Sequence, residues 1–239
     1  MDTIKYVNRK KLFLDEIEEE AGRELFSKFN KAYIVGVIEE EFKYSYGTYI
    51  KYYETRVKVK RSNGLIDYIP IIISEWMLNP YRKQNFKGKE IEVAGRFCSY
   101  KDHHPDGSSH VLLYVFASSI LIYPYNGKEN DNNNVIFLEG HLVRKPYCQV
   151  RPSGTYSADF ILSVSGRLTK TDYLKTDYIP CVAFDNSANL IETVHVGGRV
   201  RLYGRIQSRS YYKYEPKGSN NKVYGEAYEV IVHTMQEVI

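Results

Sequence analysis

The sequence predicts an all-β protein of two tandem five-stranded barrels, each with a short helix, preceded by an N-terminal α-helix. Three observations favour this fold: an internal repeat, alternating apolar and polar residues between turn residues, and a repeat length that suits a small barrel. The 239 residues are 43% hydrophobic and 26% charged, which is typical of globular proteins.

The N-terminal helix is expected over residues 11–29, within an extension formed by residues 1–31. Its apolar residues recur at three- and four-residue steps, at Leu14, Ile17, Ala21 and Leu25. This stripe could pack on the first barrel as a cap, or it could dock a second copy or another protein. Both uses bury the same residues, so both interpretations stay open.

Four short motifs occur twice in the same order, at offsets of 104 to 110 residues by subtraction of their numbers. They are Gly36 and Gly140, Gly47-Thr48-Tyr49 and Gly154-Thr155-Tyr156, Asp67-Tyr68-Ile69-Pro70 and Asp177-Tyr178-Ile179-Pro180, and Gly95-Arg96 and Gly204-Arg205. We therefore expect two copies of one domain, at residues 32–125 and 135–239. The polar, turn-rich residues 126–134 between them predict a linker.

Each copy contains several short strand-like runs and one brief helical stretch before the Gly-Arg motif. Turn residues at 101–109 and 213–222 predict a hairpin between the last two strands of each copy. A chain of about 100 residues with these elements fits the five-stranded OB-fold barrel.

Charge and cysteine content limit the class of protein. A net charge of +4 permits a polyanionic partner without requiring one, and 23 Tyr residues suit both stacking surfaces and strands. Cys98, Cys148 and Cys181 are too far apart in sequence to suggest a disulfide framework or a zinc site, so we expect reduced thiols in the cytoplasm. The charged N-terminus predicts no export signal and no membrane anchor.

The sequence gives little support to an enzyme. It shows no nucleotide-binding, zinc-protease or nucleophile-elbow motif. His103, His104, Asp106 and His110 are metal-ligating residue types, but the turn formers between them fix no coordination geometry. We expect no catalytic residue, no metal, no cofactor and no small-molecule substrate.

The strand expected at residues 199–211 carries the clearest functional signal. One face is apolar, with Val200, Leu202, Gly204 and Ile206. The other face holds Arg201, Tyr203, Arg205, Gln207, Arg209 and Tyr211. Alternating guanidinium and phenol groups suit a surface that follows a phosphate backbone and stacks on bases. A half-exposed strand that is merely basic would show the same pattern.

The motifs around this strand resemble those of the bacterial single-stranded DNA-binding proteins. The shared features are Thr-Asp-Tyr at 176–178, CVAF at 181–184, an alanine-bearing helix, and the spaced residues of RVRLYGRIQSRSY at 199–211. The segment 134–164 fits their first two strands, so the resemblance covers residues 134–235. Arg151-Pro152-Ser153-Gly154 is also similar to the primosomal replication protein of the same fold.

This resemblance implies that Tyr178, Phe184 and Tyr211 stack on bases, at positions where the family commonly has aromatic rings. It also adds Arg151 to the expected nucleic-acid-binding residues. Phe184 could instead fill the barrel interior, and that alternative stays open.

The first copy departs from the pattern. It has Glu92, Ala94, Arg96 and Asp102 where the second copy has Arg201, Tyr203, Arg205 and Tyr211. An earlier strand instead carries Arg56, Lys58 and Lys60 on one face, so either the basic stripe has moved or the first barrel is mainly structural. Tyr68, the repeat partner of Tyr178, and Trp76, near the position of Phe184, are candidate stacking rings, although Trp76 could also belong to the core.

Together these observations predict a non-catalytic protein that binds single-stranded DNA with little sequence preference, in DNA replication, recombination or repair. The resemblance also implies a homodimer with four barrels. Two alternatives remain: a primosome-type or RNA-binding accessory protein of the same fold, and an OB-fold protein-interaction module without nucleic-acid binding.

Overall fold

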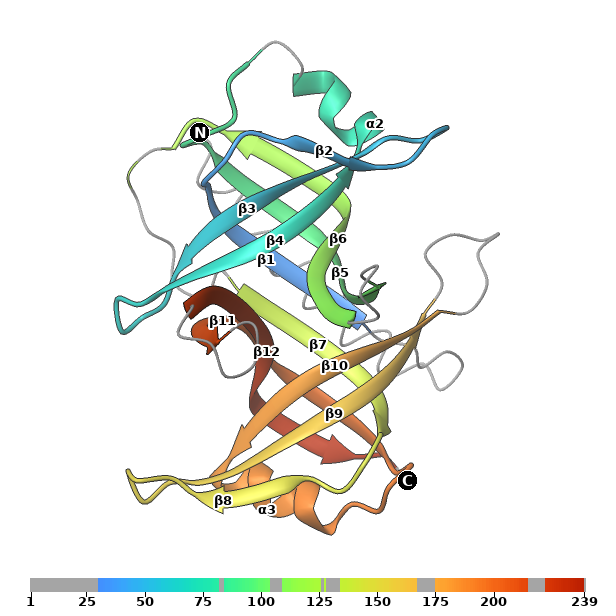
Figure 1. Ribbon diagram of the computed structural model, residues 1–239, viewed down its shortest axis with the longest axis vertical. Helices are drawn as coiled ribbons and strands as arrows, with labels where there is room; N and C mark the ends of the chain where they lie inside the picture. Colours follow the sequence, from blue (N-terminus) through green and yellow to red (C-terminus); the bar gives the residue numbers. More distant parts are fainter. Residues whose placement is uncertain are drawn as a thin grey trace, which may run out of the picture.

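The computed structural model describes residues 30–81, 84–103, 109–125, 127, 134–166, 175–214 and 222–238. Strands dominate this part of the chain and form two barrels that lie one above the other along the long axis (Figure 1). The predicted N-terminal helix, most of the predicted linker and the tips of both long hairpins lie outside the described residues. None of the described helices is long and apolar enough to cross a bilayer.

The two barrels contain matching elements in the same order, so the predicted tandem all-β fold is confirmed. The first comprises β1 (Asn30–Ile38), β2 (Lys43–Tyr46), β3 (Tyr52–Lys60), β4 (Ile66–Ser74), α2 (Glu75–Leu78), the 3₁₀ turn η1 (Asn79–Tyr81), β5 (Glu90–His103) and β6 (Ser109–Tyr123). The second comprises β7 (Asn134–Leu142), β8 (Tyr147–Val150), β9 (Tyr156–Gly166), β10 (Lys175–Phe184), α3 (Asp185–Thr193), β11 (Arg199–Tyr214) and β12 (Lys222–Glu237).

The first strand of each barrel is divided into two segments, which explains why a five-stranded barrel carries six strand labels. β1 pairs with β5 and at its end with β3, and β2 continues along β3. β7, β8, β9 and β11 repeat these pairings in the second barrel. Short parallel pairings of β4 with β6 and of β10 with β12 close the two barrels.

Strand alternation builds both cores, as β11 illustrates. Its predicted inward residues Val200, Leu202 and Ile206 are buried. The pairing of β11 with β12 shifts by one residue between Tyr203 and Gly204, at a bulge in the last hairpin. A Cβ on Gly204 would lie 2.2 Å from the carbonyl oxygen of Ile231, so only glycine fits there. The repeated Gly-Arg motif therefore marks a close backbone approach.

A continuous sheet joins the barrels. β1 and β7 pair antiparallel, with Ala32 opposite Ile136, and the strand order across the junction is β6-β5-β1-β7-β11-β12. On the face away from the barrel cores, Tyr33, Val35 and Val135 form a small buried cluster. Backbone hydrogen bonds and this cluster hold the two barrels as one body.

Each barrel also holds the other through its last hairpin, and Figure 1 shows the β5–β6 and β11–β12 hairpins reaching across the junction. Asp67 in β4 accepts a hydrogen bond from the Ser208 N–H in β11 at 2.8 Å, and Asp177 in β10 accepts one from the Ser99 N–H in β5 at 2.7 Å. The N–H of the tyrosine after each aspartate donates to the same serine hydroxyl, at 3.0 and 2.9 Å. The repeated Asp-Tyr-Ile-Pro motif thus forms a reciprocal clasp between the barrels.

Candidate nucleic-acid interface

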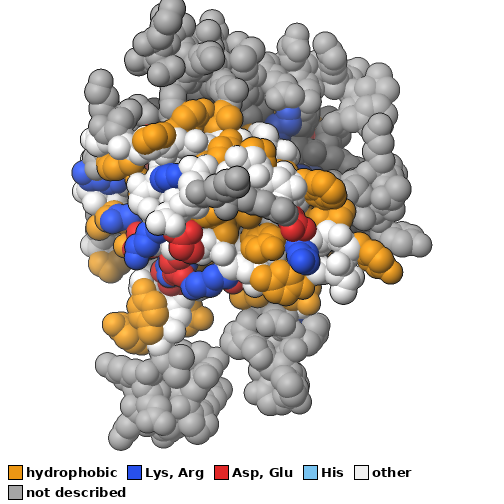
Figure 2. Space-filling model, turned by 90° about the horizontal axis from the view of Figure 1, so that it is seen from above, with side chains coloured by type: hydrophobic (Ala, Val, Ile, Leu, Met, Phe, Trp, Pro, Cys, Tyr) orange, Lys and Arg blue, Asp and Glu red, His pale blue; other side chains and the backbone are white. Residues whose placement is uncertain are grey.

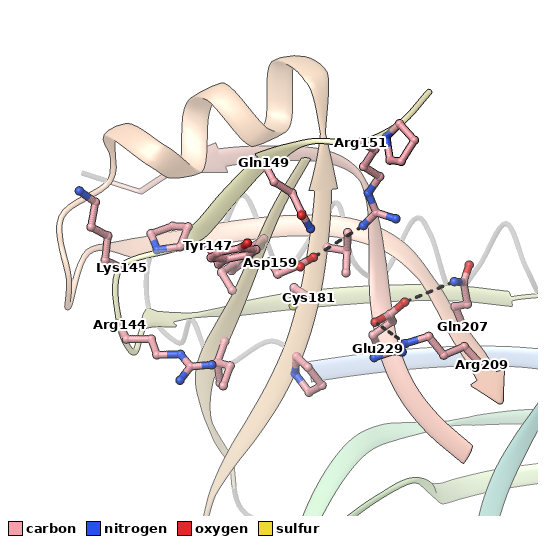
Figure 3. Close-up of a pocket in the computed structure, with 16 residues that line it drawn as sticks. Arg144, Lys145, Tyr147, Gln149, Arg151, Asp159, Cys181, Gln207, Arg209 and Glu229 are labelled. Atoms are coloured by element: carbon pink, nitrogen blue, oxygen red, sulfur yellow. Dashed lines mark hydrogen bonds and ion pairs between the residues drawn. The ribbon is translucent and has the colours of Figure 1, made fainter. Parts of the chain in front are cut away.

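An open groove of about 1050 Å³ crosses the outer face of the second barrel. The β7–β8 connection and β8 form one wall, and β11 and β12 form the other (Figure 3). Between them, Ile161, Pro180 and Val182 give the floor an apolar surface. Two residues expected from the sequence, Arg151 and Arg209, line this groove.

Cations outnumber carboxylates along the groove. Arg144 and Lys145 are exposed in the β7–β8 connection, and the Arg209 side chain is 59% exposed with its Nε 3.6 Å from the Glu229 carboxylate. The other lining carboxylate, Asp159, lies 3.8 Å from Nη2 of Arg151 (Figure 3). Long, exposed pairs of this kind contribute little to stability, so these cations can turn to a phosphate at small cost.

Three groove residues, Arg144, Lys145 and Tyr147, were missed at the level of sequence. Tyr147 is 65% exposed on the β8 wall of the groove. The signal was present as Arg144-Lys145-Pro146-Tyr147, two cations and a ring around a turn-forming proline. Such a cluster is typical of a surface that meets both phosphates and bases.

Phe184 lies at the surface beside this groove and not in the barrel interior. It is half-buried where β10 meets α3, and the guanidinium Cζ of Arg151 lies 5.0 Å from the centre of its ring. Arg151 is held there by a hydrogen bond from its Nε to the Ser157 hydroxyl at 3.0 Å. The pair presents a flat cation stacked on a flat ring.

Tyr178 and Tyr211, the other two expected stacking residues, are also accessible. Tyr178 is 52% exposed on the same outer face of β10 as Pro180 and Val182. Tyr211 is 37% exposed and continues the side of β11 that carries Arg209. Its ring packs on Gly225 in β12, where a Cβ would lie 2.5 Å from the Tyr211 Cζ.

This groove lies in the part of the chain that has recognisable relatives. Residues 133–238 match the model of the single-strand binding protein family. The match covers the C-terminal barrel, which is similar to this family. No curated protein matches the sequence.

Solved structures similar to this chain include the wild-type single-stranded DNA binding protein from Thermus aquaticus, at 16% identity and a TM-score of 0.66 over 88% of this chain and 93% of that one. A deletion mutant of the Thermus protein gives 16% identity and 0.67, over 88% and 94%. This likeness spans both barrels and shows the OB fold. The N-terminal domain of the PriB protein from Thermoanaerobacter tencongensis is 26% identical over 40% of this chain and 98% of its own, with a TM-score of 0.34 that supports no argument.

Three other expected residues of the second barrel, Arg201, Tyr203 and Arg205, do not line the groove. The Nε of Arg201 donates to buried Glu139 at 2.9 Å, on the face of the junction sheet away from the cores. Tyr203 packs against the buried cluster on the same face, and burial raises its pKa. β11 coils around the barrel, so its outward residues meet different surroundings in turn.

Arg205 lies at the inter-barrel clasp. Its Nη1 is 3.4 Å from the Asp67 carboxylate, and its Nη2 donates to Gln207 at 2.7 Å. Burial, with a smaller contribution from nearby Arg61, lowers the pKa of Arg205. The observed contacts give Arg205 a role in joining the barrels, and its contact with nucleic acid stays a prediction.

In the first barrel, Arg56, Lys58 and Lys60 alternate outward along β3 as expected, while Thr55, Val57 and Val59 are buried. The Arg56 guanidinium lies 5.0 Å from the Tyr68 ring centre, and its Nη2 is 2.6 Å from Glu226 of the second barrel. Trp76 is 69% exposed on α2, which excludes a core position. Nothing yet tests whether these residues contact nucleic acid, so that role stays a prediction.

Proposed function

We propose that the chain binds single-stranded DNA, without catalysis and with little sequence preference, in DNA replication, recombination or repair. The observation that carries this proposal is the cationic, ring-lined groove in the barrel of the single-strand binding family. Unpaired bases offer faces that stack on aromatic rings, and cations meet the phosphates between them. Neither contact reads base edges, so the groove accepts any sequence.

We assign phosphate contacts to Arg144, Lys145 and Arg209, because these exposed cations stand on both walls of the groove. Base stacking is assigned to exposed or half-buried rings, with Arg151 as a planar cation on one of them: Tyr147, Tyr178, Phe184 and Tyr211. Each stacked base contributes about 1–3 kcal/mol. Several such contacts in series give useful affinity without base-specific hydrogen bonds.

The test is titration of the full chain with a fluorescently labelled oligo-dT over a range of salt concentrations. Tight binding that weakens linearly in a plot of log affinity against log salt supports the proposal, because phosphate binding releases counterions. No binding at low salt would exclude single-stranded DNA as the ligand. The same titration with an RNA oligomer of equal length tests the RNA-binding alternative, which requires RNA to bind more tightly than DNA.

We further propose a homodimer that presents four barrels. The support is the resemblance to a family in which chains with two barrels pair. Sedimentation equilibrium should give twice the 27.9 kDa mass of one chain. A single-chain mass at micromolar concentration would contradict the pairing.

A cytoplasmic location is also proposed. Cys98, Cys148 and Cys181 form no disulfide with one another, and burial raises the pKa of the Cys181 thiol. Protected thiols of this kind suit a reducing compartment. DNA binding should therefore be unchanged by a thiol reductant, and a loss on reduction would contradict this assignment.

A further inference from the structure

The outer face of the first barrel carries a stack of three aromatic rings with one open end. Tyr46 in β2 stacks on Tyr52 in β3 with ring centres 4.8 Å apart and planes at 27°. Tyr52 in turn contacts Phe116 in β6 at 5.5 Å. Tyr46 is 43% exposed, so one side of the stack ends in solvent. Burial, then Tyr52 and Cys98, raise the pKa of Tyr46 to about 12, which keeps its hydroxyl neutral.

The open ring of this stack, Tyr46, corresponds to a residue that lines the groove in the second barrel. The repeated prolines give the correspondence between the barrels: Pro70 is paired with Arg56, and Pro180 is paired with Ile161. Four residues before these partners, Tyr52 of the first barrel therefore corresponds to Ser157 of the second. Tyr46 faces Tyr52 as Gln149, a groove-lining residue, faces Ser157. The parallel pairings align Phe116 with Ile231 in the same way.

The charges at this place differ from those of the groove. The N–H of Glu39 donates to the carbonyl of Arg56, and the N–H of Val143 donates in the same way to the carbonyl of Ile161. Glu39 therefore corresponds to Val143. The next two residues, Glu40 and Glu41, correspond to Arg144 and Lys145. Glu41 accepts hydrogen bonds from the backbone N–H groups of Phe86 and Lys87, and Glu40 pairs with Lys43. Figure 2, which looks onto this barrel, shows acidic and basic groups side by side among hydrophobic side chains.

An open ring stack without a cationic wall can hold a base but not its phosphate. We propose that the first barrel holds an unpaired base of the bound DNA by stacking on Tyr46, with the strand's phosphates turned away from Glu40 and Glu41. The inference rests on the proposed function, because it assumes that the second barrel brings the strand to the molecule. The second barrel then contributes both cations and aromatic rings to DNA binding, and the first contributes aromatic rings.

The test compares Tyr46→Ala, Tyr46→Phe and wild type in full-length protein, by oligo-dT titration at several salt concentrations. Tyr46→Ala should lower affinity by between about 5-fold and 150-fold at every salt concentration, the equivalent of one stacked base. The salt slope should not change, because no phosphate contact is lost. Tyr46→Phe should bind like wild type, since it keeps the ring.

The matched control is Tyr49→Ala, because Tyr49 lies on the same hairpin and is 100% exposed. It should leave affinity unchanged.

Two results would overturn the inference while leaving the proposed function intact: wild-type affinity in Tyr46→Ala, or a reduced salt slope in that variant. Failure of wild type to bind would instead remove the proposed function itself.

Discussion

The two barrels share one backbone plan and differ in the surface that faces a ligand. At corresponding places, the second barrel has Arg144 and Lys145, and the first has Glu40 and Glu41. Across the groove, Arg209 of the second barrel corresponds to Tyr100 of the first, because both follow the serine of the clasp. This comparison indicates that the two copies kept the contacts that join the barrels, while their ligand-facing side chains diverged.

The largest expected effect comes from breaking the shared clasp. Asp67 is 1% exposed and accepts hydrogen bonds from Arg61 at 2.8 and 2.5 Å and from Ser208 at 2.8 Å. Asp67→Ala leaves these donors without their carboxylate and should lower the free energy of unfolding by about 3–5 kcal/mol. Urea denaturation measures the change.

The matched control for the clasp is Asp159→Ala. Asp159 is 42% exposed and pairs with Arg151 only at 3.8 Å, so its loss should change stability little. If both variants had equal stability, the clasp would not hold the barrels together.

A second prediction concerns Tyr178, a proposed stacking ring on the outer face of β10 beside the residues of the groove floor. Tyr178→Ala should weaken oligo-dT binding by about 1–3 kcal/mol with unchanged stability, because the ring is half exposed and carries no core contact. Tyr125→Ala, at a ring that is 43% exposed outside the groove, is the control. Equal losses of affinity in the two variants would show that exposed rings in general, and not this groove, bind DNA.

A smaller effect tests how closely the two barrels are related. Ser99→Ala and Ser208→Ala each remove a hydroxyl that accepts a backbone N–H from the opposite barrel. Each should cost about 1 kcal/mol of unfolding free energy, and the two costs should be equal. A cost confined to one serine would mean that a single hairpin carries the inter-barrel contact.

The smallest effect concerns His233, the extra residue of the β12 bulge, whose counterpart in β6 is Ser118. Burial and then Arg205 lower the pKa of His233. His233 therefore binds a proton at a higher pH in the unfolded chain than in the folded chain. Protonation of the unfolded chain lowers the stability of the fold as the pH drops through about 6.5. His233→Ser should lose slightly less stability than wild type between neutral and mildly acidic pH, and identical pH profiles would contradict the assignment.

The repeat, the two barrels and the inward faces of the strands could be predicted from the sequence, because period-two alternation and turn residues indicate which side chains face the core. It could not show that Arg205 meets Asp67, since alternation does not tell which direction an outward residue faces around a curved barrel. The Asp-Tyr-Ile-Pro repeat was visible, but its contact with a serine of the other barrel depends on tertiary structure. Arg144 and Lys145 were overlooked because they lie in a strand break, which carries no periodicity.

The proposed function assigns the phosphate contacts to the groove of the second barrel, away from the Tyr46 stack of the first. The most direct measurement is the salt slope of oligo-dT binding for wild type, for Arg144→Ala/Lys145→Ala/Arg209→Ala, and for a control triple variant in the first barrel. The control is Lys51→Ala/Lys87→Ala/Lys89→Ala, at two exposed lysines and one partly exposed lysine that do not line the groove. Both triple variants lose three positive charges. At about 0.7 per phosphate on a single strand, the groove variant should lose about 2 from the slope, and the first-barrel variant should keep the wild-type value. Equal slopes in the two variants, or a larger loss in the first barrel, would contradict the account.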